Sequence, residues 1–252
     1  MRIAIVSDIH GNLAALEAVV ADFTRRGVDA VVNLGDALSG PLLPLETARY
    51  LMASDWTHLA GNHERQVLAT PATDDDPSDA YARSRLGEAE LSWIATLPHC
   101  LAFDDEILLC HGTPRQDNEC LLETIQPGRP RPATATEIEE RLGQIDAAVV
   151  LCGHTHIPRI VRSRRGALLV NPGSVGQPAW DDAMPFYHAV ENASPDARYA
   201  IVERRAARWR TELVAVPYDY RPMAELAIRN GRRDWESILC RGYVATALGP
   251  VA

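Results

Sequence analysis

The sequence predicts an α/β protein with two β-sheets, and a change of pattern along the chain carries this prediction. In the first half, short apolar runs alternate with segments of helical periodicity, which is typical of a parallel or mixed sheet covered by helices. After residue 156, short apolar runs follow one another across tight turns, which is typical of antiparallel strands. We therefore expect a second sheet packed on the first. No internal repeat or linker separates the halves, so we expect one domain over residues 1–252.

Three strands and two helices are predicted in the first part of the chain. Apolar runs at 2–6, 30–35 and 56–62 predict the strands, and helical periodicity covers 12–27 and 43–54. In the first helical segment, four apolar residues recur at spacings of three and four: Leu13, Leu16, Val20 and Phe23. This spacing predicts one face in the core. The segment begins at an asparagine and ends at a glycine, which are typical capping residues.

The middle of the chain predicts loops, a hairpin and further helices. Residues 71–85 are polar and punctuated by proline, so we expect a surface loop there, and the three aspartates within it lack the ligand spacing of a calcium loop. A helix is predicted near Glu88 to Leu97 and a hairpin over 101–112. A capping box of Thr136 and Glu139 predicts a helix that leads into a strand ending near residue 152.

The last hundred residues predict strands followed by one helix. The helix is expected near Pro222 to Asn230. The strand-bearing segments are 159–173, 186–190, 197–204 and 208–217. All of them are expected to belong to the antiparallel part of the fold.

The composition is that of an ordinary globular protein. Hydrophobic residues make up 46% and charged residues 23%, which disfavours the disordered and membrane classes. The N-terminus "MRIAIVSDIH" meets charge too early for a signal peptide, so we expect a cytoplasmic protein. The net charge of -9 disfavours nucleic acid as a partner. A small phosphorylated substrate stays possible, because bound metal ions can reverse the sign of the field in one cleft.

The five cysteines form no C-x-x-C pair, and their odd number disfavours a complete disulfide framework. They are Cys100, Cys110, Cys120, Cys152 and Cys240. Cys110 and Cys152 lie in apolar runs, so we interpret them as small core residues in a reducing compartment.

Five short stretches share one feature, an apolar strand that runs into a turn bearing side chains able to bind a metal ion. The stretches are "VSDIHG", "NLGDA", "AGNHE", "LCHGT" and "CGHTHIP". Their candidate functional residues are Asp8, His10, Asp36, Asn62, His63, His111, His154 and His156. Loops at strand ends are where α/β sheets place ligand sites, so we expect all five in one cleft. We interpret the remaining histidines, His58, His99 and His188, as ordinary polar or packing residues.

Each stretch alone also has a structural interpretation. An Asp-x-His can be a solvated turn, a Gly-Asp can be a helix cap, and a His-x-His at a strand end can make structural hydrogen bonds. Together, the carboxylate, carboxamide and imidazole groups form a mixed O/N ligand set that suits Mn, Fe, Co, Ni or Zn. Calcium prefers more oxygen ligands, and structural zinc usually binds cysteine. The joint pattern therefore favours a transition-metal site.

In this order the motifs resemble those of the calcineurin-like metallophosphoesterases, whose pattern is D-x-H, G-D, G-N-H-[DE], [GC]-H and G-H-x-H. The sequence matches every element from Asp8 to His156. The stretches "NPGSVGQP" (171–178) and "VPYD" (216–219) resemble the small bacterial phosphodiesterase branch, so the resemblance covers most of the chain. It implies a four-layer sandwich of two mixed β-sheets flanked by helices. It also implies a dinuclear metal-dependent phosphodiesterase that hydrolyses a small organic or nucleotide phosphoester.

The resemblance implies a role for each candidate residue. Two divalent transition-metal ions would be bound, with Mn as the expected metal. The first would be held by Asp8, His10, Asp36 and His156, and the second by Asp36, Asn62, His111 and His154. Asp36 would bridge the ions, and a metal-bridging hydroxide would attack the phosphorus. His63 has no ligand role and would assist the leaving group as a general acid.

One departure from the pattern bears on the substrate. Relatives that act on phosphoproteins or dinucleoside polyphosphates carry an Asp-Arg pair after the Gly-Asp motif, whereas "GDALSGPLLP" has no arginine. Since arginine recognises a phosphate monoester through two hydrogen bonds, this favours a diester or a small organic phosphate. The alternatives are a phosphomonoesterase, a nuclease, or a non-catalytic metal-binding scaffold of the same fold.

Several features stay open in the sequence. Arg65 and Arg159 lie near ligand motifs but are interpreted as surface or structural charges. Trp180 either lines the cleft or packs in the core. The oligomeric state is open and includes a homo-oligomer, and the substrate depends on the loops at 37–48, 64–85 and 113–133.

Overall fold

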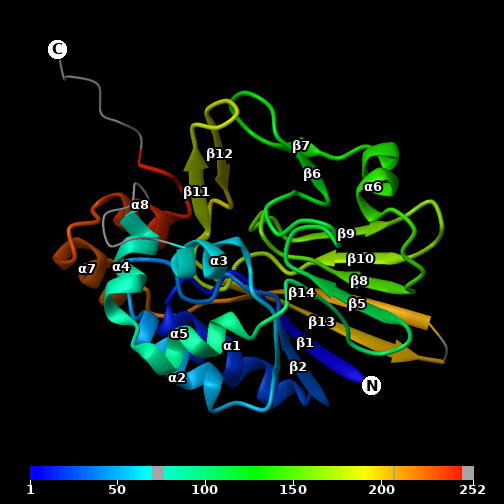
Figure 1. The fold of residues 1–252 in the computed structure, drawn as a ribbon, viewed down its shortest axis with the longest axis horizontal. Helices are drawn as coiled ribbons and strands as arrows, with labels where there is room; N and C mark the ends of the chain where they lie inside the picture. Colours follow the sequence, from blue (N-terminus) through cyan, green and yellow to red (C-terminus); the bar gives the residue numbers. More distant parts are fainter. Residues whose placement is uncertain (70–76, 207, 246–252) are drawn as a thin grey trace.

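The computed structural model describes residues 1–69, 77–206 and 208–245. Two five-stranded sheets pack face to face, and helices cover the outer faces (Figure 1). Both sheets are mixed, since each contains parallel and antiparallel pairs. The predicted four-layer α/β class is therefore confirmed.

The first sheet contains the N-terminal strand at its centre. Its strands are β1 (Arg2–Val6), β2 (Ala30–Asn33), β3 (Thr57–His58), β13 (Ala197–Arg205) and β14 (Arg208–Val216), in the order β14-β13-β1-β2-β3. The helices packed on its outer face include α1 (Leu13–Arg26), α2 (Pro44–Met52) and α5 (Glu88–Ala95). β1, β2 and β3 run parallel, which confirms the predicted alternation of strands and helices.

The second sheet is formed by the middle of the chain. Its strands are β4 (Cys100–Ala102), β5 (Ile107–Cys110), β8 (Val149–Leu151), β9 (Arg159–Arg162) and β10 (Leu168–Asn171), in the order β4-β5-β8-β10-β9. β4 and β5 form the predicted hairpin. Helix α6 (Ala135–Leu142) covers the outer face through Ile138 and Leu142.

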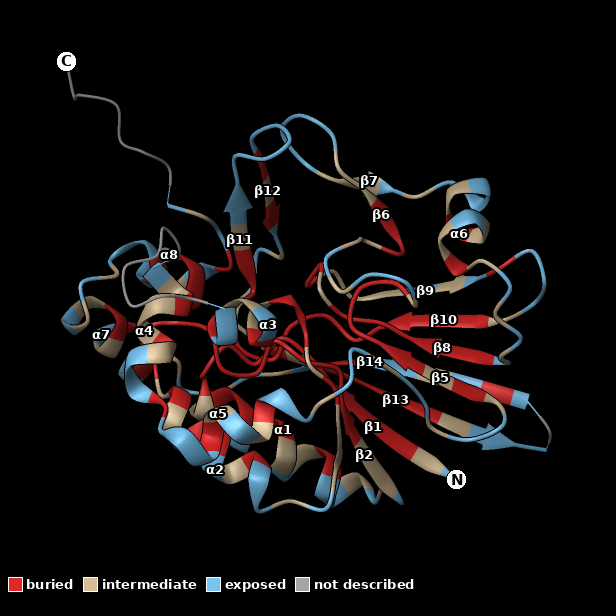
Figure 2. Ribbon diagram, in the orientation of Figure 1, coloured by how far each residue is buried: buried red, intermediate tan, exposed pale blue. Residues whose placement is uncertain are grey.

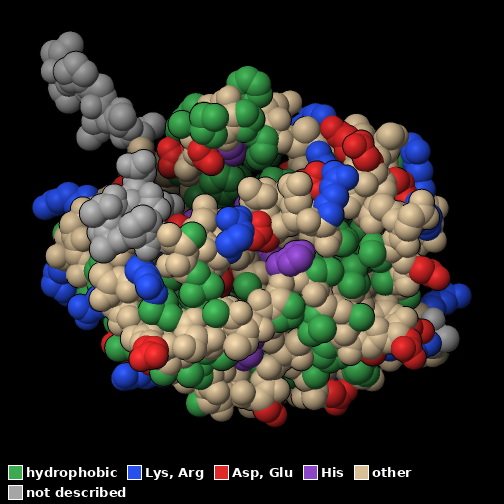
Figure 3. Space-filling view, viewed as in Figure 1, with side chains coloured by type: hydrophobic (Ala, Val, Ile, Leu, Met, Phe, Trp, Pro, Cys, Tyr) green, Lys and Arg blue, Asp and Glu red, His purple; other side chains and the backbone are tan. Residues whose placement is uncertain are grey.

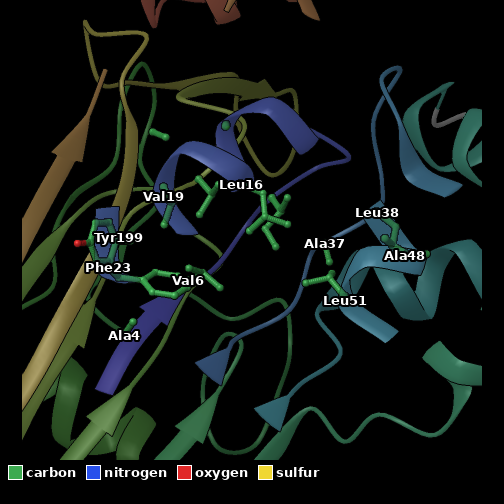
Figure 4. Close-up of a cluster of buried hydrophobic side chains, with 14 of the residues drawn as sticks. Ala4, Val6, Leu16, Val19, Phe23, Ala37, Leu38, Ala48, Leu51 and Tyr199 are labelled. Atoms are coloured by element: carbon green, nitrogen blue, oxygen red, sulfur yellow. The ribbon is translucent and has the colours of Figure 1, made fainter. Parts of the chain in front are cut away.

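Alternating side chains of β1 supply two separate cores. Ile3 and Ile5 are buried between the two sheets, together with apolar residues of β5, β8 and β10. Ala4 and Val6 point to the opposite face, where they pack under α1 (Figure 4). The central strands β1, β8 and β10 are consequently buried on both faces, as the red colouring in Figure 2 shows.

The remaining elements surround the edge of the molecule at which the strands β1, β2, β5 and β8 end. They are α3 (Asn62–Ala69), α4 (Pro77–Arg85), α7 (Arg221–Arg229), α8 (Asp234–Arg241), and the hairpins β6 (Glu123–Thr124) with β7 (Arg131–Pro132) and β11 (Ala179–Asp182) with β12 (His188–Glu191). The predicted C-terminal helix is α7. Helix α8 packs on α7 and contacts β11.

The assignment of strands to sheets differs from the prediction. The strands after residue 156 do not form one common sheet: β9 and β10 join β5 and β8, β13 and β14 join β1, and β11 and β12 form a separate two-stranded sheet. β10 is parallel to β8, so this part is not purely antiparallel. Local periodicity shows that a segment is a strand, but the partner of a strand is chosen by packing between distant segments.

Two local predictions are also corrected. Residues 77–85, which were expected in a loop, form helix α4. This helix is mostly polar and has no apolar stripe, since its buried residues are Asp79 and Ala82. The rest of the predicted loop, residues 71–76, lies outside the described residues. The capping box of α6 is Thr134 with Glu137 rather than Thr136 with Glu139. The sequence contains both overlapping matches, and the earlier one starts the helix directly before residue 135.

Candidate metal centre

All five predicted motifs converge at one edge of the two sheets. Their residues follow the carboxyl ends of β1, β2, β3, β5 and β8, and the polar groups form two clusters. Asp8, His10 and His156 form one cluster, and Asp36, His111 and His154 form the other; within each, the potential ligand atoms lie within 4.8 Å of one another. The two histidines of "GHTH" thus belong to different clusters.

The first cluster contains lone pairs that face each other. Nε2 of His10 lies 3.2 Å from Nε2 of His156, while their Nδ1 atoms lie 2.8 and 2.7 Å from the carbonyl oxygens of Ser39 and Gln177. Because a carbonyl oxygen only accepts, each Nδ1 donates, and each neutral ring keeps an unprotonated Nε2. Oδ1 of buried Asp8 lies 3.3 Å from Nε2 of His156 and has no hydrogen-bond donor among the described residues. When both rings are neutral, three acceptor atoms face one another, and this arrangement fits a bound cation.

The second cluster is oriented in the same way. Nε2 of His111 lies 3.0 Å from Oδ2 of Asp36 and 3.2 Å from Oδ1 of Asn62, and its Nδ1 lies 2.8 Å from the carbonyl oxygen of Leu34. Nδ2 of Asn62 donates to Oε1 of Gln66 at 2.9 Å, so the amide oxygen faces His111. These oxygen and nitrogen donors suit a divalent transition-metal ion.

Burial and charge perturb the titration of both clusters. Burial alone would raise the pKa of Asp36, but His111 and other imidazoles hold that pKa well below its usual range. Burial opposes the charged form of His111, but Asp36 raises the pKa of His111 to about 9. Burial and neighbouring imidazoles lower the pKa of His10 to about 3 and of His154 to about 4. Without a metal, His111 is thus protonated at neutral pH, whereas His10 and His154 are neutral.

The candidate ligands lie on strained backbone. Among the described residues, seven residues other than glycine have positive φ, and five of them belong to the two clusters: Asp8, His10, Asp36, His154 and His156. The left-handed region is unfavourable for residues with a Cβ and is tolerated where the surrounding structure enforces it. The fold therefore holds these side chains in directions that relaxed loops would not adopt.

Two motif glycines are explained by close approach. A Cβ on Gly61 would lie 2.1 Å from Oδ1 of Asp36 and 2.7 Å from Cε1 of His111, and a Cβ on Gly153 would lie 2.1 Å from Oγ of Ser7. A larger residue at either position would displace a candidate ligand or the strand end that carries it.

Glu64 is a buried positioning residue whose role the sequence did not predict. Its buried carboxylate accepts hydrogen bonds from the backbone N–H groups of Asp36 (2.8 Å), Ala37 (2.8 Å) and Gly61 (2.7 Å). It therefore ties the loop after β2 to the turn before α3. The acidic position of the G-N-H-[DE] pattern was the available signal for this role.

Asp79 is a second residue that the sequence analysis missed. Its Oδ1 lies 2.9 Å from Nδ1 of His63, and its side chain is buried. The backbone N–H of His63 donates to Oδ1 of Asp36 at 2.9 Å, which places His63 beside the second cluster. No sequence signal identified Asp79, because it follows a polar segment without helical periodicity.

Both clusters open into one pocket of about 900 Å³. Besides the candidate functional residues, the pocket is lined by Ser39, Gln66, Pro77, Ser78, Asn118, Cys120, Ile125, Gln177, Trp180, Asp181, Asp182, Met184, Pro185, His188, Arg232, Asp234, Trp235 and Ile238. Figure 3 shows the hollow below the hairpin β11–β12, with apolar side chains gathered on the hairpin and a histidine visible inside. Trp180 lines this pocket and donates from Nε1 to the carbonyl oxygen of Thr155 at 3.4 Å.

The other polar residues singled out in the sequence have structural partners. Arg65 pairs with Asp117 at 2.7 Å, and Arg159 pairs with buried Glu123 at 2.6 Å, as expected of structural charges. His58 lies 3.1 Å from Oγ of Ser54, and His188 packs its ring against Trp180. His99 is exposed.

The cysteines of the chain do not contribute to these clusters. All five are free thiols, and Cys110 and Cys152 are buried in the core of the second sheet, as predicted. Burial raises the pKa of both thiols well above the usual range.

Within the described part of the chain, no helix combines the length and the apolar character that crossing a membrane requires.

Comparison with known proteins agrees with this arrangement. Residues 1–192 match the calcineurin-like phosphoesterase superfamily domain. The chain is 25% identical over 256 residues to an uncharacterized protein of Methanocaldococcus jannaschii, covering 92% of this chain and 94% of the relative. It is 29% identical over 184 residues to the phosphodiesterase YfcE of Escherichia coli, covering 71% of this chain and 81% of YfcE.

Solved structures show the same fold. The metallophosphoesterase of Sphaerobacter thermophilus superposes with a TM-score of 0.77 at 24% identity, covering 96% of this chain and 99% of that structure. Together with the superfamily match over 192 of 252 residues, this similarity agrees with the two clusters of ligand groups. The chain belongs to the calcineurin-like phosphoesterase superfamily and is a metal-dependent phosphoric ester hydrolase.

Proposed function

We propose that the protein is a dinuclear phosphodiesterase that acts on a small organic phosphoester and works with Mn²⁺. The observation that carries the proposal is the pair of adjacent O/N clusters, each of which offers the ligands for one ion. Asn62 would add its amide oxygen to the second cluster, and Asp36 would serve both ions. The similarity to the phosphodiesterase YfcE supports a diester as the substrate. The pocket of about 900 Å³ leaves room for an organic group on either side of a phosphorus atom.

Each part of the site has a proposed task. Bound divalent ions would neutralise phosphoryl oxygens and lower the pKa of water. Asp8, His10 and His156 would hold one ion, Asn62, His111 and His154 would hold the other, and Asp36 would reach both. His63 would donate a proton to the departing oxygen from the pocket side, while Asp79 keeps its ring in place.

Hydrolysis of bis(p-nitrophenyl) phosphate with added Mn²⁺ tests this proposal. Asp36→Asn is expected to lower kcat by roughly 10²–10⁴-fold, since it removes a ligand charge. His63→Ala is expected to lower kcat by less with this substrate, because p-nitrophenolate needs little proton donation to leave. His99→Ala serves as the matched control because His99 is exposed and does not line the pocket. Full activity in both site variants would refute the proposal.

The monoesterase alternative is decided in the same assay. A phosphodiesterase should show a higher kcat/KM for bis(p-nitrophenyl) phosphate than for p-nitrophenyl phosphate. The loop after Asp36, which lacks arginine, offers no bidentate partner for the extra charge of a monoester. A strong preference for the monoester would assign the protein to the phosphatases instead.

A further inference from the structure

One wall of the pocket lies outside the part of the chain that matches the superfamily. The match ends at residue 192, whereas Arg232, Asp234, Trp235 and Ile238 all line the pocket. Three of them belong to α8, and Arg232 lies two residues before the first residue of that helix. Because a phosphoryl group fills only a small part of about 900 Å³, the organic part of the substrate must contact walls of this kind.

Trp235 connects this wall to the metal clusters. The indole is 1% exposed, and its ring centroid lies 6.4 Å from that of His10. A Cβ on Gly40 would lie 3.0 Å from the indole, so α8 packs directly on the loop that follows Asp36. This is the loop in which the sequence lacks an arginine.

Arg232 places a fixed positive charge on the same wall. The chain contains no lysine, and Arg232 is the one arginine among the described residues that line the pocket. Its guanidinium carbon lies 5.9 Å from the centroid of Trp235, and Nη1 donates to Oγ of Ser78 at 2.9 Å. Only 20% of the side chain is exposed. These contacts hold the guanidinium in the pocket before any substrate binds.

An anion already occupies the donor face of Arg232. Nε and Nη2 donate to the carboxylate of Asp234 at 3.0 and 2.6 Å. Asp234 is 47% exposed, and such a pair contributes little stability in water, so an anionic group of a substrate can replace it at low cost. The hairpin wall carries Asp181 and Asp182, which repel anions, so Arg232 offers the favourable position.

We propose that Arg232 binds a second anionic group of the substrate, a phosphate or carboxylate separate from the phosphorus that is attacked. The indole of Trp235 lies 5.9 Å from the guanidinium carbon of Arg232 and 6.4 Å from the ring of the candidate ligand His10, so we place the second anionic group beside the attacked group and not on it. This inference rests on the proposed function and deepens it: the substrate is a phosphoester that carries a further anion on its organic part.

Two matched substrates test the inference. Thymidine 5′-(p-nitrophenyl phosphate) and its 3′-phosphate share the attacked group and the leaving group, and differ by one phosphate placed one sugar ring away. The wild type with Mn²⁺ is expected to prefer the 3′-phosphate by roughly tenfold or more in kcat/KM, mainly through KM. Arg232→Gln should reduce this preference to about one, and Arg232→Lys should keep part of it.

Arg233→Gln is the matched control, because Arg233 is exposed and does not line the pocket, and it should keep the full preference. Equal KM values of the wild type for both substrates, or a preference that survives in Arg232→Gln, would overturn the inference. If the wild type hydrolyses neither substrate, the proposed function fails by itself. Calorimetric binding of thymidine 3′,5′-bisphosphate and thymidine 5′-monophosphate to the Mn²⁺-loaded protein then decides the role of Arg232 separately.

Discussion

Nδ1 of His63 lies 2.9 Å from Oδ1 of Asp79, and this contact joins α3 to α4 at the mouth of the metal centre. Asp79 is buried, whereas His63 is 23% exposed and lines the pocket. A carboxylate accepts from Nδ1, and in the proposed mechanism Nε2 is the ring atom that donates a proton to the substrate. The pair therefore has the arrangement of an oriented general acid.

Asp79→Asn is expected to slow the hydrolysis of alkyl phosphodiesters more than that of p-nitrophenyl diesters. An alkoxide leaves poorly without a proton, whereas p-nitrophenolate leaves more readily, so loss of orientation at His63 should cost roughly ten- to hundredfold with the alkyl substrates only. Steady-state kinetics with both substrate classes measures the difference. Asp55→Asn, at an exposed position, is the control. An equal loss for both classes would contradict the proposed role of Asp79.

His154→Ala and His156→Ala are expected to weaken different metal sites. The two histidines belong to different clusters, so each variant should retain the ion held by the other. Titration with Mn²⁺ followed by measurement of bound metal should give about one tightly bound ion for each variant and two for the wild type. Loss of the same single ion in both variants would disprove the assignment of the two histidines.

Metal binding is expected to release about one proton near neutral pH. The pKa of His111 is raised to about 9 because Asp36 outweighs the effect of burial, whereas His10 and His154, with pKa values of about 3 and 4, are already neutral. A metal ligand must be an unprotonated imidazole, so His111 gives up its proton. Calorimetry in buffers of different ionisation enthalpy measures the release, which should disappear as the pH rises above 9.

The same shift predicts how the metal-free protein responds to pH. The pKa of folded His111 lies above its ordinary value of 6.5, so the stabilisation from this group is fully present below pH 6.5 and is lost as the pH rises through about 9. Urea unfolding of metal-free protein across this range should show a falling free energy of unfolding. A free energy that rises over the same range would show that His111 is not the protonated partner of Asp36.

Gly61→Ala is expected to impair metal binding and to destabilise the fold. The new Cβ would lie 2.1 Å from Oδ1 of Asp36, and the carboxylate or the backbone must move, at a cost of about 1–3 kcal/mol. Gly87→Ala is the control, because its new Cβ would meet only the end of the Glu90 side chain. Denaturant unfolding and Mn²⁺ affinity measure both effects. Equal behaviour of the two variants would show that the close approach at Gly61 is unimportant.

Local signals in the sequence account for most of the elements. The first helix has its predicted caps, Asn12 and Gly27, because a cap depends on residues a few positions away. The buried apolar face of this helix was predicted less accurately. Leu16 and Phe23 are buried as expected, but Leu13 and Val20 are half-buried. Helix α4 was missed because its role is to present Asp79 rather than to bury an apolar face.

The sequence by itself determined the chemistry of the protein: which polar groups follow which strand ends, and hence a mixed O/N metal centre. This was possible because a strand, a turn and a ligand lie within a few neighbouring residues. Only the tertiary structure decided that β13 pairs with β1, that Asp79 reaches His63 and that Arg232 reaches the pocket. These relationships join residues far apart in the chain, and they depend on side-chain packing that no local periodicity records.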